Sequence, residues 1–435
     1  MDTAPPSPSP ISARATPGAQ HGPWTSKLGP GLVAGAADDD PSGIATYSQA
    51  GAQFGFGMLW TVLLTYPLMV GIQMTSARIG RVTGRGLASN IRRHYPAPLL
   101  YAIVLLLLVA NTINIAADIA AMGQAVQLLA GGPAPLYAAG FGVLSLLLQI
   151  FIPYQRYVHI LKWLTLALLA YVATLLVVRV PWLRVLHDTV LPRLQWTPAW
   201  LTTVVAVLGT TISPYMFFWQ SSQEVEELNA NPQAQALKRA PEQAEAEYRR
   251  IRLDTLTGMG FSNLVAFCIM LTAAITLHAH GVREIATSAQ AASALRPVAG
   301  DFAFILFTIG IIGTGMLAIP VLAGSAAYAV AGAFHWRSSL ELAPSAARKF
   351  YGIIAASTLA GVALGFARFD PIQALYWSAV INGVIAVPVM AVMMHLGGMP
   401  SVMGKQVLPR WLKALGWACT GAMAAAVAAM LVTMA

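Results

Sequence analysis

Long apolar stretches alternate with short polar breaks along most of the chain, and each stretch is roughly 20 residues long. A helix of that length crosses the hydrocarbon core of a bilayer, which is about 30 Å thick. The pattern therefore predicts an all-α polytopic membrane protein with eleven spans. The predicted spans cover residues 27–53, 56–77, 97–129, 134–153, 157–179, 199–228, 256–279, 301–333, 349–367, 370–396 and 411–433.

The polar segments between and before the spans complete the predicted organisation. Residues 1–26 are rich in Pro, Ser and Ala and contain no apolar core, so we predict a disordered cytoplasmic tail and no signal peptide. Residues 27–433 then form a single transmembrane domain. Residues 180–196 are too polar to span and predict a short external helix, whereas residues 228–254 predict a solvated, partly helical cytoplasmic loop.

Charge is scarce and unevenly distributed in this chain. Only 10% of the residues are charged, against about a quarter in soluble domains. The net charge of +9 could suit a nucleic acid, but the positions of the cations explain it otherwise. With the N-terminus in the cytoplasm, 20 Lys and Arg fall on that side and 6 on the other, which is the positive-inside bias. We therefore expect an inner-membrane protein whose C-terminus is extracytoplasmic. It should contact the lipid bilayer, bind no nucleic acid and be a monomer.

The first span is interrupted by the run Asp38-Asp39-Asp40-Pro41-Ser42-Gly43. Carboxylates at membrane depth are costly and commonly mark an ion path. Proline removes a backbone donor and glycine permits unusual torsions, so the helix should break here and free carbonyls for a cation. In the alternative, the span starts after Asp40 and the acids lie in the cytoplasm. The apolar stretch 28–37 opposes it, because it is too short to span and too apolar for a loop.

Span six repeats this design. Its apolar start is followed by Gly209-Thr210-Thr211-Ile212-Ser213-Pro214-Tyr215, again with a proline in mid-span among small and hydroxyl residues. Two interrupted spans at corresponding positions of two five-helix halves indicate an inverted-repeat transporter whose site lies near the midplane.

Two further spans carry polar residues. Asn111, Asn114 and Asp118 in span three follow an i, i+3, i+7 spacing and share one face, which should look into the protein. Asp118 is either a carboxylate near the ion path or a structurally satisfied group. In span ten, Asn382-Gly383 is either another polar break or a packing glycine beside a satisfied amide.

The residues around the first break resemble a known family. Gly29-Pro30-Gly31, Asp40-Pro41-Ser42-Gly43 and the run from Gln49 to Gly55 are similar to the first span of the NRAMP divalent-metal transporters. The likeness extends over nearly all predicted spans. It implies the LeuT-type fold, with inverted repeats at about 27–179 and 199–396 plus an eleventh helix. In that family the Asp of the Asp-Pro motif and a Met before the proline of span six bind manganese or ferrous iron, and Asp40 matches this Asp.

The chain departs from the family at four positions. It has Gly43 in place of Asn, Ser213 in place of the Met, Tyr215 in place of a His, and Ala121 in place of a Glu. Without the soft thioether, only oxygen ligands remain, and these suit hard cations. Small side chains at 43 and 213 are expected to widen the site for an ion that keeps its waters. The pattern resembles the NRAMP-related magnesium transporters, and the missing His and Glu imply weak or absent proton coupling.

These features define the expected site. Asp40 should supply the principal charge, with carbonyls near Gly43 and Thr210 and the hydroxyls of Thr210 and Ser213 completing the ligand set. The residues expected along the access path or around the ligands are Asp38, Asp39, Asp118, Tyr215, Asn382 and Glu224. No cofactor is expected apart from the transported ion, Mg²⁺ or Mn²⁺.

Three rival functions are weaker. A proton-coupled manganese or iron transporter, like the main family, is the second reading because the Met is missing. A sodium-coupled amino-acid symporter on the same fold is more remote, since three aspartates would repel the substrate carboxylate. An enzyme is not expected, because the chain has no His-Glu-x-x-His motif or other set of nucleophile and base.

Overall fold

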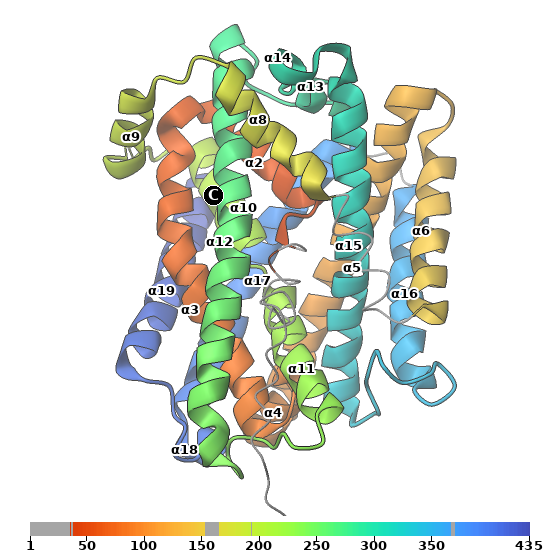
Figure 1. The fold of residues 1–435 in the computed structure, drawn as a ribbon, viewed down its shortest axis with the longest axis vertical. Helices are drawn as coiled ribbons and strands as arrows, with labels where there is room; N and C mark the ends of the chain where they lie inside the picture. Colours follow the sequence, from red (N-terminus) through yellow and green to blue (C-terminus); the bar gives the residue numbers. More distant parts are fainter. Residues whose placement is uncertain (1–34, 36–37, 153–164, 193, 367–369) are drawn as a thin grey trace, which may run out of the picture.

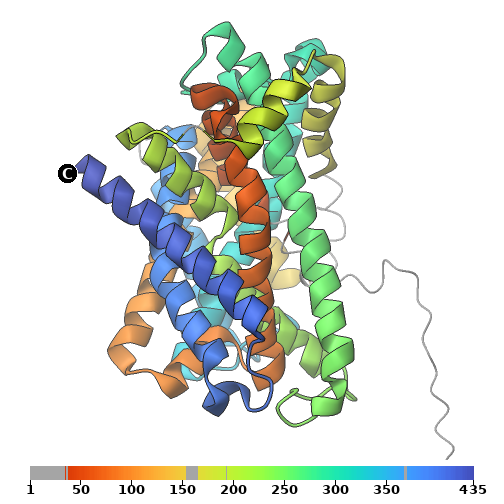
Figure 2. The same ribbon diagram turned by 90° about the vertical axis from the view of Figure 1, so that its left-hand side faces the viewer.

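The computed structural model describes residues 35, 38–152, 165–192, 194–366 and 370–435. The predicted tail, the start of the first span and the start of the fifth fall outside these residues. Within them the chain is entirely helical, as the apolar pattern predicts (Figures 1 and 2). The longer helices are α2 (Pro41–Phe54), α3 (Leu59–Thr83), α4 (Leu87–His94), α5 (Ala97–Ala130), α6 (Ala134–Phe151), α8 (Leu169–Val177), α9 (Trp182–Val190), α10 (Pro198–Thr211), α11 (Pro214–Ala230), α12 (Ala244–Thr276), α15 (Ala303–Phe334), α16 (Arg348–Gly365), α17 (Pro371–Gly398) and α19 (Arg410–Met434).

Short helices connect several of these elements. Most lie in turns at the two ends of the bundle, where the chain reverses direction. They are η2 (Gly55–Met58), η3 (Thr165–Leu168), η4 (Pro241–Gln243), η5 (His278–His280), α13 (Ser288–Ser293), α14 (Arg296–Ala299), η6 (Gly300–Phe302) and α18 (Pro400–Met403).

The number of spans depends on how the breaks are counted. In the described part of the chain, eight helical segments are long and apolar enough to cross a membrane, or nine if a bent pair at residues 166–190 is one span. One of the eight, Pro41–Thr83, contains both α2 and α3. Helix α16 is not among them, since Arg348 and Lys349 at its start dilute its apolar character. The count of eleven therefore stays a prediction, although each predicted span contains a described helix.

The connecting segments divide between the two ends of the bundle. Helices α4 and α18 and the α11–α12 connection lie at one end, and α9, α13 and α14 lie at the other (Figure 1). Helix α19 runs obliquely between the ends (Figure 2). The groups of loops that the charge bias places on opposite sides of the membrane are thus on opposite ends of the molecule. The short helix expected within residues 180–196 is α9.

The helices of the two interrupted spans approach their neighbours closely through glycines. A Cβ added at Gly209 of α10 would collide with the backbone of Ala379 and Gly383 in α17. A Cβ at Gly51 of α2 would likewise collide with the carbonyl of Met270 in α12. Gly383 is therefore a packing residue, and α17 continues through it as an unbroken helix. Of the two alternatives for span ten, the packing glycine is confirmed at Gly383 and the polar break is wrong.

The α11–α12 connection is largely exposed and partly helical, as expected for residues 228–254, but part of it packs against α3. The backbone N–H groups of Leu237 and Lys238 donate to the carbonyls of Arg81 and Val82 (3.2 and 3.1 Å), and Leu237 is fully buried. Helix α12 already begins at Ala244. This segment is therefore packed against the end of α3, because it brings its own apolar side chain and backbone donors to that surface.

Candidate ion site at the two helix breaks

Asp40 stands at the start of α2 and caps it. Its backbone is extended (φ −69°, ψ 172°), and its Oδ1 accepts a hydrogen bond of 2.8 Å from the Gly43 N–H. Proline at the next position is suited to the first turn of a helix because it has no N–H to leave unsatisfied. The Asp-Pro-Ser-Gly run therefore starts a helix in the interior of the protein. Asp38, Asp39 and Asp40 are only 1–2% exposed, which rules out the alternative that they lie in the cytoplasm.

A relay of polar side chains holds the second oxygen of Asp40. The Asn114 Nδ2 of α5 donates to Asp40 Oδ2 at 3.0 Å, and the Ser378 hydroxyl of α17 donates to Asn114 Oδ1 at 2.6 Å. All three side chains are buried. The carboxylate is thus fixed between α2, α5 and α17 by groups that carry no charge, and its negative charge remains available to a cation.

The second break lies beside the first. Helix α10 ends at Thr211 and α11 begins at Pro214, so Ile212 and Ser213 interrupt span six. The hydroxyls of Ser42 and Thr210 are 3.3 Å apart, and those of Tyr47 and Thr211 are 3.0 Å apart. Two hydroxyl pairs therefore join the breaks. The expectation that spans one and six are interrupted and meet is confirmed.

Gly43 sits at this junction in close contact with its neighbours. A Cβ at Gly43 would lie 3.3 Å from the Tyr47 ring, 3.4 Å from the Asp38 carbonyl and 3.5 Å from the Thr210 hydroxyl. The site is therefore not wide at Gly43, contrary to expectation, since Tyr47 and Thr210 occupy the space. The same contacts show that Gly43 lies between Asp38 and Thr210, where carbonyl and hydroxyl oxygens converge.

Ser213 turns its hydroxyl back onto the end of α10. Its Oγ lies 2.8 and 2.9 Å from the carbonyl oxygens of Gly209 and Thr210, which share its single hydrogen. The bond therefore engages the Thr210 carbonyl that was expected to serve as a free ligand. Ser213 Oγ and both carbonyl oxygens keep free lone pairs, so these three oxygen atoms can still coordinate a cation.

Asp38 and Asp39 share one partner. The Ser262 hydroxyl of α12 lies 2.9 Å from Asp38 Oδ2 and 3.1 Å from Asp39 Oδ1, and it has a single hydrogen to donate. Asp39 Oδ2 is buried without a hydrogen-bond partner among the described residues. Two adjacent buried carboxyls with one donor between them carry a large negative potential beside Asp40 unless protons or cations compensate it.

The remaining predicted path residues fall into two groups. Asp118 and Tyr215 are buried near Asp40, close enough for electrostatic interaction with it, and no described residue pairs with the two carboxyl oxygens of Asp118. The structure therefore does not support the alternative of a satisfied Asp118. Asn382 is buried in α17, and its Oδ1 also has no described partner, although a satisfied amide was one alternative for this position.

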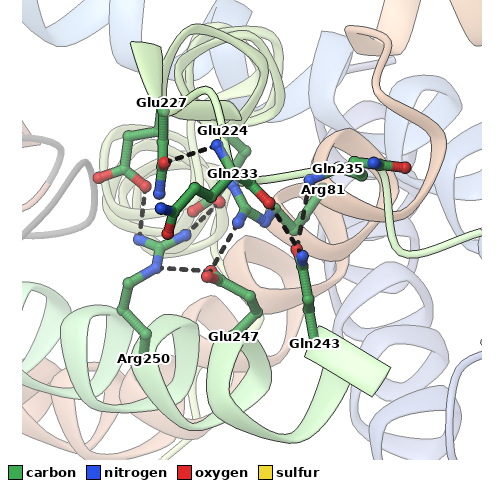
Figure 3. Close-up of polar contacts among 9 residues, drawn as sticks. Arg81, Glu224, Glu227, Gln233, Gln235, Gln243, Glu247 and Arg250 are labelled. Carbon is green, nitrogen blue, oxygen red and sulfur yellow. Dashed lines mark hydrogen bonds and ion pairs between the residues drawn. The ribbon is translucent and has the colours of Figure 1, made fainter. Parts of the chain in front are cut away.

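Glu224 lies apart from Asp40, in a charge cluster at the α4 end of the bundle. The cluster consists of Arg81, Glu224, Glu227, Glu247 and Arg250, and Figure 3 shows Arg250 reaching toward the glutamates of α11. Glu224 Oε2 pairs with Arg250 at 2.5 Å, and Arg250 also pairs with Glu227 and Glu247 at 2.8 and 3.0 Å. Arg81 joins through Glu247 at 2.8 Å. In this conformation Glu224 therefore holds α11 to α12.

Sequence reasoning did not select three residues of the hydrogen-bond network around the aspartates, in which Asn114 and Ser262 contact an aspartate and Ser378 contacts Asn114. Asn114 was noted only as part of a polar face, and Ser262 and Ser378 were not noted. The i, i+3, i+7 face of span three was a usable signal for Asn114, because it placed the amide on the same side as Asp118. A single serine in an apolar helix carries no such signal. In the described part of the chain no three His, Cys, Asp or Glu side chains form a group suited to hold a metal.

Solved structures with a similar fold are transporters. A manganese transporter of Eremococcus coleocola aligns with a TM-score of 0.73 and 17% identity, covering 95% of this chain and 87% of that one. The protein MhsT, in complex with L-phenylalanine, aligns with a TM-score of 0.59 and 13% identity over 94% of this chain and 98% of that one. At these identities the likeness concerns the fold alone, and it confirms the LeuT-type architecture.

The relatives found by sequence carry the same name. A divalent metal cation transporter MntH of Acidiphilium cryptum is 29% identical over 412 residues, which are 88% of this chain and 90% of that protein. An MntH of Klebsiella pneumoniae is 27% identical over 405 residues, covering 90% of each. The family model described as "Natural resistance-associated macrophage protein-like" matches residues 31–433. The chain is a member of the Nramp family.

Proposed function

We propose that this protein transports divalent metal ions across the inner membrane and that it is not an enzyme. The observation that carries the proposal is the burial of Asp40 where both helix breaks meet, with Asn114, Thr210 and Ser42 as neutral neighbours. Asp40 has no cationic partner among the described residues and lies beside freed helix ends, and a buried carboxylate of this kind is suited to bind a cation. The relatives named divalent metal cation transporters support the same substrate class.

We further propose Mg²⁺ as the preferred ion and Mn²⁺ as the second candidate. Ser213 supports this choice, because it replaces a thioether with a hydroxyl that stays among carbonyl oxygens. Oxygen ligands suit Mg²⁺, which keeps several of its waters. Transport of manganese with proton coupling remains the competing reading, and the manganese transporter of similar fold favours it. Calorimetry with Mg²⁺, Mn²⁺ and Ca²⁺ on the purified protein decides between them, and tighter binding of Mn²⁺ would reject our choice.

Transport itself follows from the broken helices. One bundle rocks against the rest around a site fixed near the midplane, and the ion enters the cytoplasm down the membrane potential. A potential of 100 mV would supply about 4.6 kcal/mol for each divalent ion crossing the full drop. We propose a cytoplasmic N-terminus, an extracytoplasmic C-terminus, a monomer in the bilayer, and weak or absent proton coupling. An uptake rate that does not change with an imposed proton gradient is the expected result.

Substitution of Ser213 tests the selectivity. Ser213→Met introduces a soft thioether beside Asp40, so the preference for Mn²⁺ over Mg²⁺ should rise by about tenfold, the lower end of effects from altered metal surroundings. Competition between the two ions for uptake into proteoliposomes measures it. Ser213→Ala is the control, because it removes the hydroxyl without adding sulfur. An equal shift in both variants would contradict the role assigned to the side chain at this position.

Substitution of Asn114 tests the relay that holds Asp40. Asn114→Leu keeps the volume but removes the donor to Asp40 and the acceptor for Ser378. Metal affinity should fall by about 10-fold, as for other groups that orient a ligand. Thr112→Val is the control on the same helix, since the Thr112 hydroxyl bonds to the Leu108 carbonyl and, within the described residues, to no group near Asp40. Calorimetry that finds equal affinity in the two variants would show that Asn114 does not position Asp40.

A further inference from the structure

A cationic cavity lies beside α9, away from the ion site. It has a volume of about 720 Å³ and is lined by the turn η2, the end of α12 and the amphipathic helix α9. Arg179, Arg184 and Arg283 line it, with Asp188 as the single acidic residue, so the net charge is +2 with the histidines neutral. Arg184 pairs loosely with Asp188 at 3.7 Å. The guanidinium groups of Arg179 and Arg283 form no ion pair with any described residue, and both are exposed.

An apolar groove is lined, like this cavity, by residues of α9 and α12, and it lies along the membrane-spanning part of the molecule. The groove has a volume of about 270 Å³ and lies between α3 and α12, lined by Val62, Leu63, Leu264 and Phe267 and closed at one end by Thr189 of α9. Leu63 and Leu264 are 58% and 56% exposed. Exposed large apolar side chains on a membrane-spanning helix face lipid.

The cavity and the groove share one face of α12. The α12 residues that line them are Gly260, Asn263, Leu264, Phe267, Ala274 and Ile275, which recur at helical spacing. From Gly260 to Ile275 the helix rises about 22 Å. One leaflet of a bilayer, including its headgroups, is about 20–22 Å thick. The pair of sites therefore has the length of one lipid molecule.

Helix α9 marks the level of the membrane interface. Trp182, Leu183 and Leu186 are 53%, 89% and 60% exposed on one side of it, while Arg184 and Asp188 face the cavity. A short helix with such a division lies in the interface, with its apolar side toward the acyl chains and Trp at the headgroup level. The arginines are thus at headgroup depth, and the groove is at acyl-chain depth.

We propose that this surface binds an anionic phospholipid, with its phosphate among Arg179, Arg184 and Arg283 and one acyl chain in the α3–α12 groove. The charge of the cavity complements a phosphate, and the adjoining groove complements a hydrocarbon chain. Basic pockets next to membrane helices recognise lipid headgroups by the same combination. The lipid would bridge α3, α9 and α12, and the transported ion plays no part in its binding.

Native mass spectrometry of the full-length protein tests the headgroup. Protein from mixed vesicles of phosphatidylglycerol and phosphatidylcholine should retain phosphatidylglycerol. Each arginine removed should lower that affinity about fivefold, so the double variant Arg179→Gln/Arg283→Gln should lose about 25-fold. Arg296→Gln is the matched control, because Arg296 lies near the same end over the Phe304 ring and does not line the cavity. Equal retention of both lipids, or no loss in the double variant, would overturn the proposal.

Two further arms separate a lipid from a free anion. Leu264→Gln should reduce retention of phosphatidylglycerol, whereas Leu359→Gln on α16, which is 49% exposed outside the groove, should not. Inorganic phosphate in excess should fail to displace the lipid, because it gains nothing from the groove. Displacement by phosphate, or an equal effect of the two leucine variants, would show that the cavity binds anions without the acyl chain.

Discussion

Uptake of metal into proteoliposomes should fall by at least about 100-fold in Asp40→Asn. A carboxylate about 4 Å from a divalent ion contributes roughly 8 kcal/mol at an effective dielectric constant of about 20, and the amide contributes no net charge. The cost of removing the carboxylate and the ion from water cancels part of this attraction. The net attraction that remains is still larger than the free energy that corresponds to a 100-fold loss of uptake. Asparagine is as good a helix N-cap as aspartate, so it can still accept from the Gly43 N–H and preserve the start of α2.

The control for this experiment is Asp301→Asn, which removes one negative charge from an exposed position at the α14 end of the bundle. Its uptake should equal that of the unchanged protein. Transport by Asp40→Asn at the same rate as by Asp301→Asn would remove Asp40 from the ion path. Thermal unfolding of both variants in detergent establishes that a loss of uptake is not a loss of fold.

Removal of Arg250 should destabilise the protein by about 3 kcal/mol, at the lower end of values for breaking a buried ion pair because Arg250 is partly exposed. Arg250→Ala leaves Glu224 fully buried and Glu227 without their cation. The expected result is a lower midpoint of thermal unfolding. Figure 3 shows why the effect is concentrated in this residue, which contacts three glutamates at once.

The adjacent Arg249→Ala is the matched control, since Arg249 is exposed and forms no ion pair in the described part of the chain. Adding Glu224→Gln to Arg250→Ala should recover part of the stability, because it removes the uncompensated charge. Equal midpoints for Arg249→Ala and Arg250→Ala would show that the charge cluster does not support the α11–α12 connection. A double variant no more stable than Arg250→Ala would exclude burial of the Glu224 charge as the cause.

The apolar pattern and the two prolines predicted most of the architecture. Blocks of membrane-spanning length can only become helices, since every backbone group in lipid must be satisfied within the chain. Asp40-Pro41 and Ser213-Pro214 determined where helices α2 and α11 begin, because each proline lacks the N–H that an interior helical position requires. Membership of the family was also evident from these residues. The number of spans was less certain, because α16 is short and begins with two cations.

The side chains that surround the three aspartates could not be predicted from the sequence. Asn114, Ser262 and Ser378 come from three helices far apart in sequence. Only packing brings Asn114 to Asp40, Ser262 to Asp38 and Asp39, and Ser378 to Asn114. Gly43 suggested an open site, yet Tyr47 and Thr210 fill the space beside it. A small side chain creates room only if its neighbours leave the room empty, and those neighbours are determined by the packing of α2 against α10.

The same distinction applies at the two ends of the molecule. Residues 228–254 look like a solvated loop in sequence, because charged residues are frequent there. Packing against α3 changes their role, since Arg250 finds three glutamates and Leu237 finds a buried position. The sequence alone thus determined the helices, their breaks and the class of ion, which depend on local chemistry. Only the tertiary structure decided which polar groups hold Asp40, which cations are paired, and where α9 brings arginines beside an apolar groove, because these depend on contacts between distant segments.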